Sequence, residues 1–224
     1  MRAMDDKAFD LLVTDPPYFL PAAHYATRKT FKRNFGDLGI LEGYFREWWT
    51  EVARVLKPTG SFYLFCDGQS YPLFYYYAYF FTKNVRPLIW DKVSAFSGFG
   101  WRHQHEIILW GEMPDARPIN TGDGDIIRCP AVKVDERVHP AEKPVDIFRK
   151  LIEKSGNAGC SVLDPFLGSG SSRIAAYDLG FDFTGYELDK DYFEAQEKRF
   201  ADHIAQAKLF DAPVLETVEQ NNLF

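Results

Sequence analysis

The chain has 224 residues, of which 46% are hydrophobic and 26% charged, a balance that is ordinary for one globular domain with a sizeable core. Its three cysteines have no metal-like spacing, which argues against a disulfide framework and favours a reducing compartment, expected to be the cytoplasm. The net charge of −6 argues against a strongly basic nucleic-acid protein, although a local basic patch can still bind. Residues 1–10 lack the apolar stretch of a signal peptide.

The first part of the chain alternates short apolar strands with helices. Residues 9–14 predict a buried strand that ends in a Pro-Pro turn, and residues 18–39 predict a loop. Large apolar residues at helical spacing predict a helix over 41–56, and residues 61–66 predict a second strand. The uncharged aromatic run that follows is too short to cross a bilayer and predicts a buried helix near 72–82.

The middle of the chain is less regular. Two strands are predicted at 85–91 and 105–110, joined by an aromatic segment with glycines, as in a hairpin at the edge of a sheet. Residues 111–138 are rich in Pro, Gly and Asp, which predicts an irregular insertion. Pro144 then begins a predicted helix that ends near residue 155.

The last part of the chain returns to regular alternation. Strands are predicted at 161–163 and 181–186, and helices at 171–179 and 190–207. Alternating strands and helices with Gly-rich turns predict a single α/β domain, residues 1–224, built on a doubly wound, mostly parallel sheet with a reversed edge strand. Such a sheet binds its ligands at the carboxyl ends of the strands.

One Gly-rich string lies between a predicted strand and a predicted helix. In Asp164–Gly170 (DPFLGSG), Gly168 and Gly170 let backbone approach a ligand, and the helix that follows offers amide donors. The next strand ends in Glu187, where dinucleotide folds place the acid that accepts ribose hydroxyls. The string lacks the lysine of a phosphate-binding loop, so the string and Glu187 together predict a nucleoside site. The alternative is that Asp164 and Glu187 only cap a helix and carry surface charge.

A second string, Asp15-Pro16-Pro17-Tyr18, directly follows the first predicted strand. The two prolines stiffen the loop and remove its backbone donors, which leaves acceptors free for a planar amine. The Asp15 carboxylate and the Pro16 carbonyl would bond the amine hydrogens, and Tyr18 would stack on the base for about 1–3 kcal/mol. A purely structural turn is the alternative, but the location at the ligand-binding edge favours a site.

A third string, His139–Pro144 (HPAEKP), lies between these two motifs, and together the three resemble the signatures of the DNA amino-methyltransferases. These S-adenosylmethionine-dependent enzymes methylate adenine N6 or cytosine N4, among them the enzymes of restriction–modification systems. The motif order is that of the β group. The resemblance implies a Rossmann-like methyltransferase fold, S-adenosylmethionine as cofactor, and double-stranded DNA with a flipped base as substrate. Asp at the first motif position is similar to the adenine-N6 members, so cytosine N4 is the alternative.

The resemblance also implies roles for individual residues. Asp15, Pro16 and Tyr18 would hold the base, with Pro17 shaping the loop. Asp164 would face the methionine end of the cofactor and Glu187 its ribose hydroxyls. The other implied cofactor residues are Phe166, Gly168, Ser169, Gly170, Ser172, His139 and Lys143, of which His139, Lys143 and Ser172 would lie near the methionine carboxylate.

The chain departs from the family pattern in three places. Phe19 follows the Tyr of the first motif, where many members have Asn, and this changes one pocket contact. Most members carry a further strand and an acidic motif ahead of this point, but only fourteen residues precede Asp15, so we expect one edge strand fewer. The region 111–138, where target recognition is expected, is short, and site specificity would be short, relaxed or shared with a partner.

Other features have competing interpretations. Arg28, Lys29, Lys32 and Arg33 follow the catalytic loop and are expected to contact DNA phosphates, with a solvated loop as the alternative. His103 and His105 alternate, but no further ligands complete a metal site, so we expect no metal. Aromatic surface and an open sheet edge would suit a homodimer, and no membrane partner is expected.

Activities that share this fold remain open from the motifs alone. RNA adenine methylation uses the same chemistry, and methylation of a protein glutamine also acts on a planar amide. The glutamine enzymes usually have Asn first in the motif and the opposite motif order. A catalytically silent partner subunit that binds nucleic acid is the alternative from another class, and the intact motifs argue against it.

Overall fold

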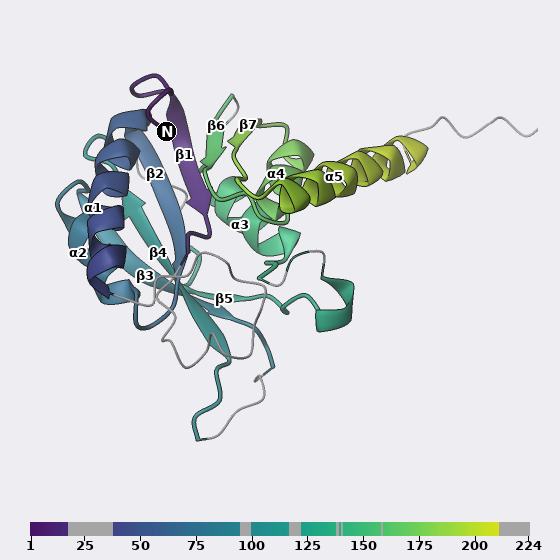
Figure 1. Ribbon diagram of the computed structural model, residues 1–224, viewed down its shortest axis with the longest axis horizontal. Helices are drawn as coiled ribbons and strands as arrows, with labels where there is room; N and C mark the ends of the chain where they lie inside the picture. Colours follow the sequence, from purple (N-terminus) through teal and green to yellow (C-terminus); the bar gives the residue numbers. More distant parts are fainter. Residues whose placement is uncertain are drawn as a thin grey trace, which may run out of the picture.

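The computed structural model describes residues 1–17, 38–94, 100–116, 122–137, 139, 141–157 and 159–210. A seven-stranded sheet forms the middle layer (Figure 1). Helices α1 and α2 cover one face, and α3, α4 and α5 lie on the other (Figure 1). The helices are α1 Leu38–Val55, α2 Tyr71–Tyr79, α3 Val145–Ser155, α4 Ser171–Asp178 and α5 Lys190–Phe210, with a short 3₁₀ turn at Val134–Glu136.

The strand order is β5-β3-β4-β2-β1-β6-β7. The strands are β1 Phe9–Thr14, β2 Leu56–Cys66, β3 Asn84–Asp91, β4 His105–Glu112, β5 Ile126–Arg128, β6 Ser161–Asp164 and β7 Asp182–Gly185. All neighbours pair in parallel except β4, which is antiparallel to β2 and to β3. The doubly wound, mostly parallel sheet predicted from the sequence is therefore confirmed.

The central strands are apolar on both faces because helices cover both. In β2, Phe62 and Leu64 pack in the core under α1 and α2, whereas Tyr63 and Phe65 pack in the core under α3 and α4. All four side chains are at most 1% exposed. A strand buried on both faces has a continuous apolar sequence in place of an alternating one, which accounts for the run SFYLFC.

The position of the reversed strand differs from the prediction. β4 lies inside the sheet, because β5 adds in parallel to the far side of β3. The expectation that 111–138 is entirely irregular is wrong for the same reason: Ile126–Arg128 pairs with Ile89–Asp91. Three residues between Pro- and Gly-rich segments carry too little periodicity to predict a strand.

The aromatic helix is less buried than predicted. Phe74 and Ala78 are fully buried, but Tyr76, Tyr79 and Phe80 are 58%, 62% and 64% exposed. The nine-residue α2 packs one side against the rest of the protein, and its other side faces outward. An uncharged sequence therefore does not guarantee burial on both sides. None of the described helices combines the length and apolar character needed to cross a membrane.

The reversed strand matters for the location of the site. The carboxyl ends of the parallel strands lie at one edge, and an antiparallel neighbour begins at that edge. The register places Glu106 of β4 opposite Trp90, near the carboxyl end of β3. Asp15 follows β1, Asp164 ends β6 and Glu187 follows β7 at this edge. One edge of the sheet therefore gathers charged residues from many parts of the chain.

Candidate active site

The turn between β6 and α4 depends on two glycines. Gly168 and Gly170 have φ values of 51° and 76°, in the left-handed region that favours glycine. A Cβ added to Gly170 would lie 3.0 Å from Oε1 of the buried Gln196. Gly170 is also the N-cap of α4, so the turn presents the start of that helix, with its amide donors, at the sheet edge. The structure therefore has the Gly-rich strand-to-helix turn that the sequence predicts, and ligand binding by this turn stays a prediction.

Asp164 holds that turn together. Its Oδ1 accepts hydrogen bonds from Thr14 Oγ1 at 2.6 Å and from the Phe166 amide at 3.0 Å, and its Oδ2 accepts one from Ser172 Oγ. The residue is 1% exposed, and burial raises the pKa of its carboxyl to about 6 although the three donors oppose the shift. Because Thr14 directly precedes Asp15, this carboxyl also joins the two motifs physically.

Glu187 lies beside the same turn. Its two carboxylate oxygens accept hydrogen bonds from the amides of Gly168 at 2.9 Å and Asp189 at 2.8 Å. Each carboxylate oxygen has a second lone pair, so these bonds fix the side chain without using up its capacity as an acceptor. The two amides therefore fix the Glu187 carboxylate just after β7, and the carboxylate can still accept hydrogen bonds from hydroxyl groups.

We call the turn Asp164–Gly170 the cofactor turn, after the role that the sequence predicts for it, and the third motif places His139 against this turn. A Cβ on Gly168 would lie 3.9 Å from His139 Cε1, and the imidazole packs edge-on against Tyr192 with ring centroids 4.3 Å apart. Burial lowers the pKa of His139, which favours the neutral ring. Of the residues implied by the resemblance near the methionine carboxylate, His139 and Ser172 lie at the turn.

Lys143 has a different neighbour. Its Nζ lies 2.6 Å from Asp15 Oδ2 and 3.3 Å from Glu106 Oε2, and the lysine side chain is 7% exposed. Glu106 also pairs through Oε1 with Lys92, the residue that follows β3. We call these four residues (Asp15, Lys143, Glu106 and Lys92) the charged cluster. It lies at the end of β1, where the motif DPPY begins.

Sequence reasoning missed Glu106 and Lys92. Lys92 directly follows β3 and Glu106 is the second residue of β4, and in the sequence both look like ordinary solvated strand ends. The role of Glu106 becomes visible only once the topology is known, because a reversed strand brings its first residues to the edge of the sheet where the parallel strands end. The interaction joins residues distant in sequence, and no local pattern predicts it.

Some predicted site residues are not placed. Tyr18 and Phe19, together with the basic residues Arg28, Lys29, Lys32 and Arg33, lie outside the described residues. Pro16 is buried and Pro17 half-buried after β1. In the part of the chain that the structure describes, no three His, Cys, Asp or Glu side chains are grouped to hold a metal ion.

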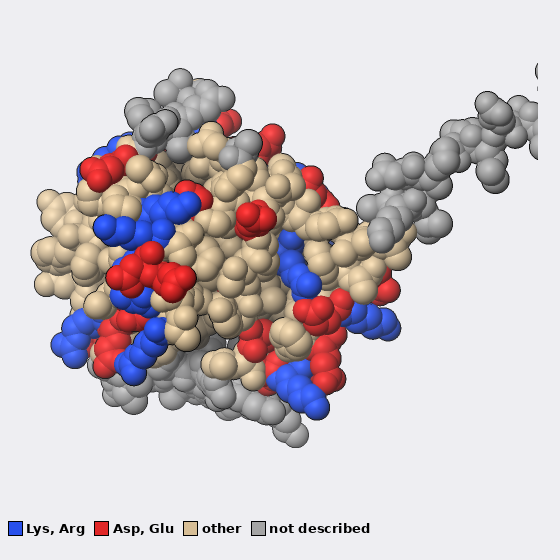
Figure 2. All heavy atoms as spheres, turned by 90° about the horizontal axis from the view of Figure 1, so that it is seen from above, with Lys and Arg blue, Asp and Glu red and all other residues tan. Residues whose placement is uncertain are grey.

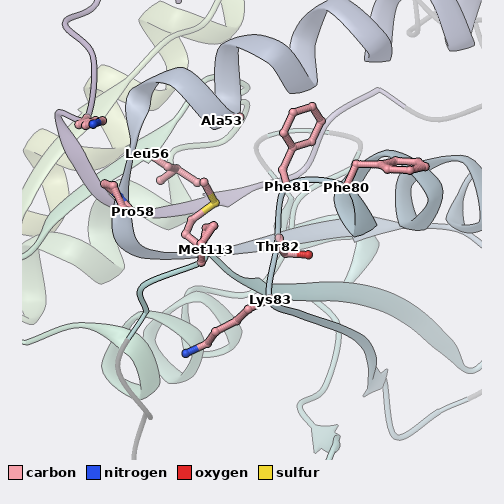
Figure 3. A pocket seen from close by; sticks show the side chains of 10 residues that line it. Ala53, Leu56, Pro58, Phe80, Phe81, Thr82, Lys83 and Met113 are labelled. Carbon is pink, nitrogen blue, oxygen red and sulfur yellow. The ribbon is translucent and has the colours of Figure 1, made fainter.

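The opposite edge of the sheet is different in character. An apolar pocket of about 420 Å³ lies there, between the ends of α1 and α2 and the starts of β2 and β3, with Leu56, Pro58 and Met113 in its wall (Figure 3). Because the pocket lies at the starts of β2 and β3, whereas Asp15 and Asp164 lie at the carboxyl ends of β1 and β6, it is separate from the three motifs. Acidic and basic side chains lie next to one another on the face seen from above in Figure 2.

Comparison with known proteins bears on this arrangement. The sequence model of a family described as DNA methylase matches residues 9–138 and 127–198, which include all three motifs. The chain belongs to the DNA methylase family. The cofactor of this methylase is S-adenosylmethionine, as the family resemblance implied, and the chain is a DNA methyltransferase.

Curated relatives are type II methyltransferases. M.HpaI of Haemophilus parainfluenzae is 26% identical over 89% of the methylase chain and 70% of its own length. M.HinfI of Haemophilus influenzae is 24% identical, and M2.DpnII of Streptococcus pneumoniae is 25% identical, each again over 89% of the chain. The aligned part makes up 65% of M.HinfI and 85% of M2.DpnII.

Solved structures confirm the fold. The M1.HpyAVI–SAM complex superposes with a TM-score of 0.64 at 24% identity, covering 86% of this chain and 89% of that one. A putative DNA modification methylase of Thermus thermophilus, complexed with S-adenosylmethionine, gives a TM-score of 0.70 at 21% identity over 91% and 89%. PvuII DNA methyltransferase, described as cytosine-N4-specific, gives 0.72 at 14% identity over 92% and 87%. The predicted Rossmann-like methyltransferase fold is therefore confirmed.

The cofactor turn fits this cofactor chemically. A nucleoside joined to a methionine carries ribose hydroxyls, a carboxylate and an ammonium group. Glu187 offers an acceptor, and the start of α4 offers a positive dipole end and backbone amides. Gly168 and Gly170, whose φ values lie in the left-handed region, have no side chains, so the cofactor can approach the backbone of the turn closely.

Proposed function

We propose that this methylase transfers the methyl group of S-adenosylmethionine to the N6 amine of an adenine flipped out of double-stranded DNA. The observation that carries the proposal is the hydrogen bond of 2.6 Å between Thr14 and Asp164. It ties the end of β1, with the amine-binding motif, to the cofactor turn at the end of β6. The two halves of a methyl-transfer site are thereby neighbours on adjacent strands.

The chemistry requires activation of a weak nucleophile. The lone pair of an aromatic amine is delocalised into the ring, and acceptors on its hydrogens localise that pair on nitrogen. In this proposal, Asp15 and the Pro16 carbonyl supply such acceptors, and Tyr18 is the stacking partner. When bound, S-adenosylmethionine would supply the methyl group and its sulfur would keep the electron pair of the broken sulfur–carbon bond, while the amine nitrogen would form the new bond to carbon and release one proton. Catalysis here consists mainly of positioning and exclusion of water.

Further parts of the proposal concern binding. Glu187 holds the ribose hydroxyls, Asp164 faces the methionine end, and His139 and Ser172 lie near the methionine carboxylate. Phe166, Gly168, Ser169 and Gly170 line the pocket. The residues Arg28, Lys29, Lys32 and Arg33 contact phosphates, and 111–138 contributes to target recognition. Flipping the base costs a few kcal/mol, which binding of the extruded adenine offsets. A homodimer is a further expectation of this proposal.

Identifying the methylated base tests the proposal. The purified chain is incubated with unmethylated genomic DNA and S-adenosylmethionine labelled with tritium on the methyl group, and the DNA is then digested to nucleosides and separated. We expect the label in N6-methyldeoxyadenosine. Label in N4-methyldeoxycytidine would show that the substrate base is wrong, and label-free DNA would argue for a silent subunit.

An Asp15→Ala variant tests the assignment of the site. The variant lacks the carboxylate that would accept a hydrogen bond from the amine. We therefore expect the rate of methyl transfer to fall at least about 1,000-fold, within the range for removal of a group that acts in the transition state. S-adenosylmethionine binding, measured by calorimetry, should be retained, because Asp15 lies outside the cofactor turn. Full activity of this variant would exclude Asp15 as the amine acceptor.

A further inference from the structure

The four residues of the charged cluster alternate in sign, and Lys143 is the buried member while the other three are half-buried. Asp15 contacts Lys143 at 2.6 Å, Lys143 contacts Glu106 at 3.3 Å, and Glu106 contacts Lys92. Two carboxylates and two ammonium groups balance in charge. Three strand ends and the loop before α3 supply these residues. The cluster therefore joins segments that are far apart in the sequence.

The ammonium group of Lys143 is held on several sides. The residue is 6% exposed, and its Nζ lies 5.6 Å from the centre of the Phe65 ring. Burial opposes the charged form, but the Asp15 and Glu106 carboxylates outweigh burial and raise the pKa of Lys143. A buried cation paired with two anions cannot leave without exposing unpaired charges, which is costly. Lys143 is therefore a fixed group.

Glu106 supplies the second anchor of that lysine. Burial opposes its ionisation, yet Lys143 and Lys92 together lower the pKa of Glu106. Its carboxylate divides its two oxygens between the two lysines. The side chain comes from the start of β4, a rigid strand in the middle of the sheet. The position of Lys143 is thus set by a rigid element.

We propose that Lys143 is a positioning residue that fixes the Asp15 carboxylate for the substrate amine, and that Glu106 acts on Asp15 only through Lys143. This inference rests on the proposed function, in which Asp15 accepts a hydrogen bond from the amine. By holding Oδ2, Lys143 sets the plane of the carboxylate. A hydrogen bond that localises the nitrogen lone pair depends on that direction. The role differs from the contact with the methionine carboxylate that the family resemblance implies for Lys143.

The first test replaces the lysine with a neutral side chain of similar length, Lys143→Met. We expect kcat to fall about 100-fold, as for a misplaced catalytic group. The Kd for S-adenosylmethionine, measured by calorimetry, and the KM for DNA should stay within about twofold of the unmodified enzyme. The matched control is Lys57→Met, which removes a lysine paired with Asp10 at 2.7 Å at the opposite edge of the sheet. The control should keep its kcat.

The second test uses Glu106→Gln, which keeps the shape of the side chain. We expect kcat to fall about tenfold, because Lys143 loses one of its anchors. The double variant Lys143→Met with Glu106→Gln should be no slower than Lys143→Met alone, since the contacts described between Glu106 and Asp15 run through Lys143. Multiplied losses in the double variant would show independent roles and would overturn the proposal.

Other outcomes also test the roles proposed for Lys143 and Glu106. Unchanged kcat in Glu106→Gln overturns the role of Glu106 even if Lys143→Met fails to fold. A weakened Kd for S-adenosylmethionine with normal kcat at saturation would show that Lys143 serves the cofactor, which also overturns the proposal. Asp15→Ala is run alongside: if it is inactive while Lys143→Met is fully active, the proposed function stands and only the lysine's role falls. If Asp15→Ala keeps full activity, the proposed site itself fails.

Discussion

Two carboxyl groups at the same sheet edge, the buried Asp164 and the half-buried Glu106, have opposite electrostatic environments. Asp164, in the cofactor turn, has three uncharged donors, and burial raises its pKa to about 6. Glu106, in the charged cluster, has two lysines, and their charges outweigh burial and lower its pKa. Burial alone therefore does not determine the charge of an acid; the charge of its partners does.

This difference follows the chemistry proposed for each region. In the cofactor turn, uncharged hydroxyl and amide donors bond the Asp164 and Glu187 carboxylates, and these bonds shape the backbone around a ligand. The charged cluster holds an anion, Asp15, in a fixed direction beside the amine. Damage to the first region should therefore appear in cofactor affinity and stability, and damage to the second in the rate of methyl transfer.

The largest effect outside the charged cluster is expected for Glu187→Ala. The variant removes the acceptor proposed for the ribose hydroxyls and also the partner of the Gly168 amide. A hydrogen bond to a charged group contributes about 1.5–3 kcal/mol, so the Kd for S-adenosylmethionine should rise roughly 10- to 100-fold. Calorimetry gives the Kd, and kcat at saturating cofactor should change little. A loss in kcat with normal Kd would remove the distinction between the two regions.

The contrast between the two acids can be measured as a pH dependence of stability. Because the folded-state pKa of Asp164 is raised above its ordinary 3.8, its contribution is fully present below about pH 4 and is lost as the pH rises through about 6. Between these values, the advantage of the unmodified protein over Asp164→Asn should fall by about 1.4 kcal/mol per pH unit. Urea unfolding at several pH values measures this difference.

The same experiment on Glu106→Gln should give the opposite sign. The pKa of Glu106 is lowered from 4.5, so its contribution is present above about pH 4.5 and is lost as the pH falls through the folded-state pKa. Parallel pH trends for the two variants would contradict the opposite environments of these two acids.

The smallest effect is expected for Gly170→Ala. Its φ of 76° strains any side chain, and the added Cβ would meet Gln196. We expect the free energy of unfolding to drop by about 1–2 kcal/mol, with a weaker Kd for S-adenosylmethionine and no primary loss in kcat. The matched control is Gly68→Ala, where a Cβ meets nothing within 4 Å. Equal stability of the two variants would show that the turn does not need its glycine.

Much of the fold was predictable because its signals are local. Apolar spacing predicted the helix that became α1, and the Gly-rich string predicted the turn before α4. The position of β4 inside the sheet was not predictable, since it depends on Ile126–Arg128 pairing with β3. The exposure of Tyr76, Tyr79 and Phe80 depends on which side of α2 meets the core, and an all-aromatic run carries no such pattern.

The candidate site also has a part that the sequence predicts and a part that it does not. The acids Asp15, Asp164 and Glu187 stand at or just after strand ends, and that placement predicts a shared edge. Glu106 stands at the start of a strand, and it reaches the edge only because β4 is reversed. The contact of Lys143 with Asp15 joins two motifs whose separation in sequence gives no hint of a distance of 2.6 Å.

The most direct test is a crystal structure of the protein with S-adenosylmethionine bound. The account predicts the ribose hydroxyls on the Glu187 carboxylate, the methyl group directed toward the loop that begins at Asp15, and Lys143 still paired with Asp15 and Glu106. A cofactor carboxylate bound to Lys143, with the Asp15 contact broken, would contradict the division of work between the cofactor turn and the charged cluster.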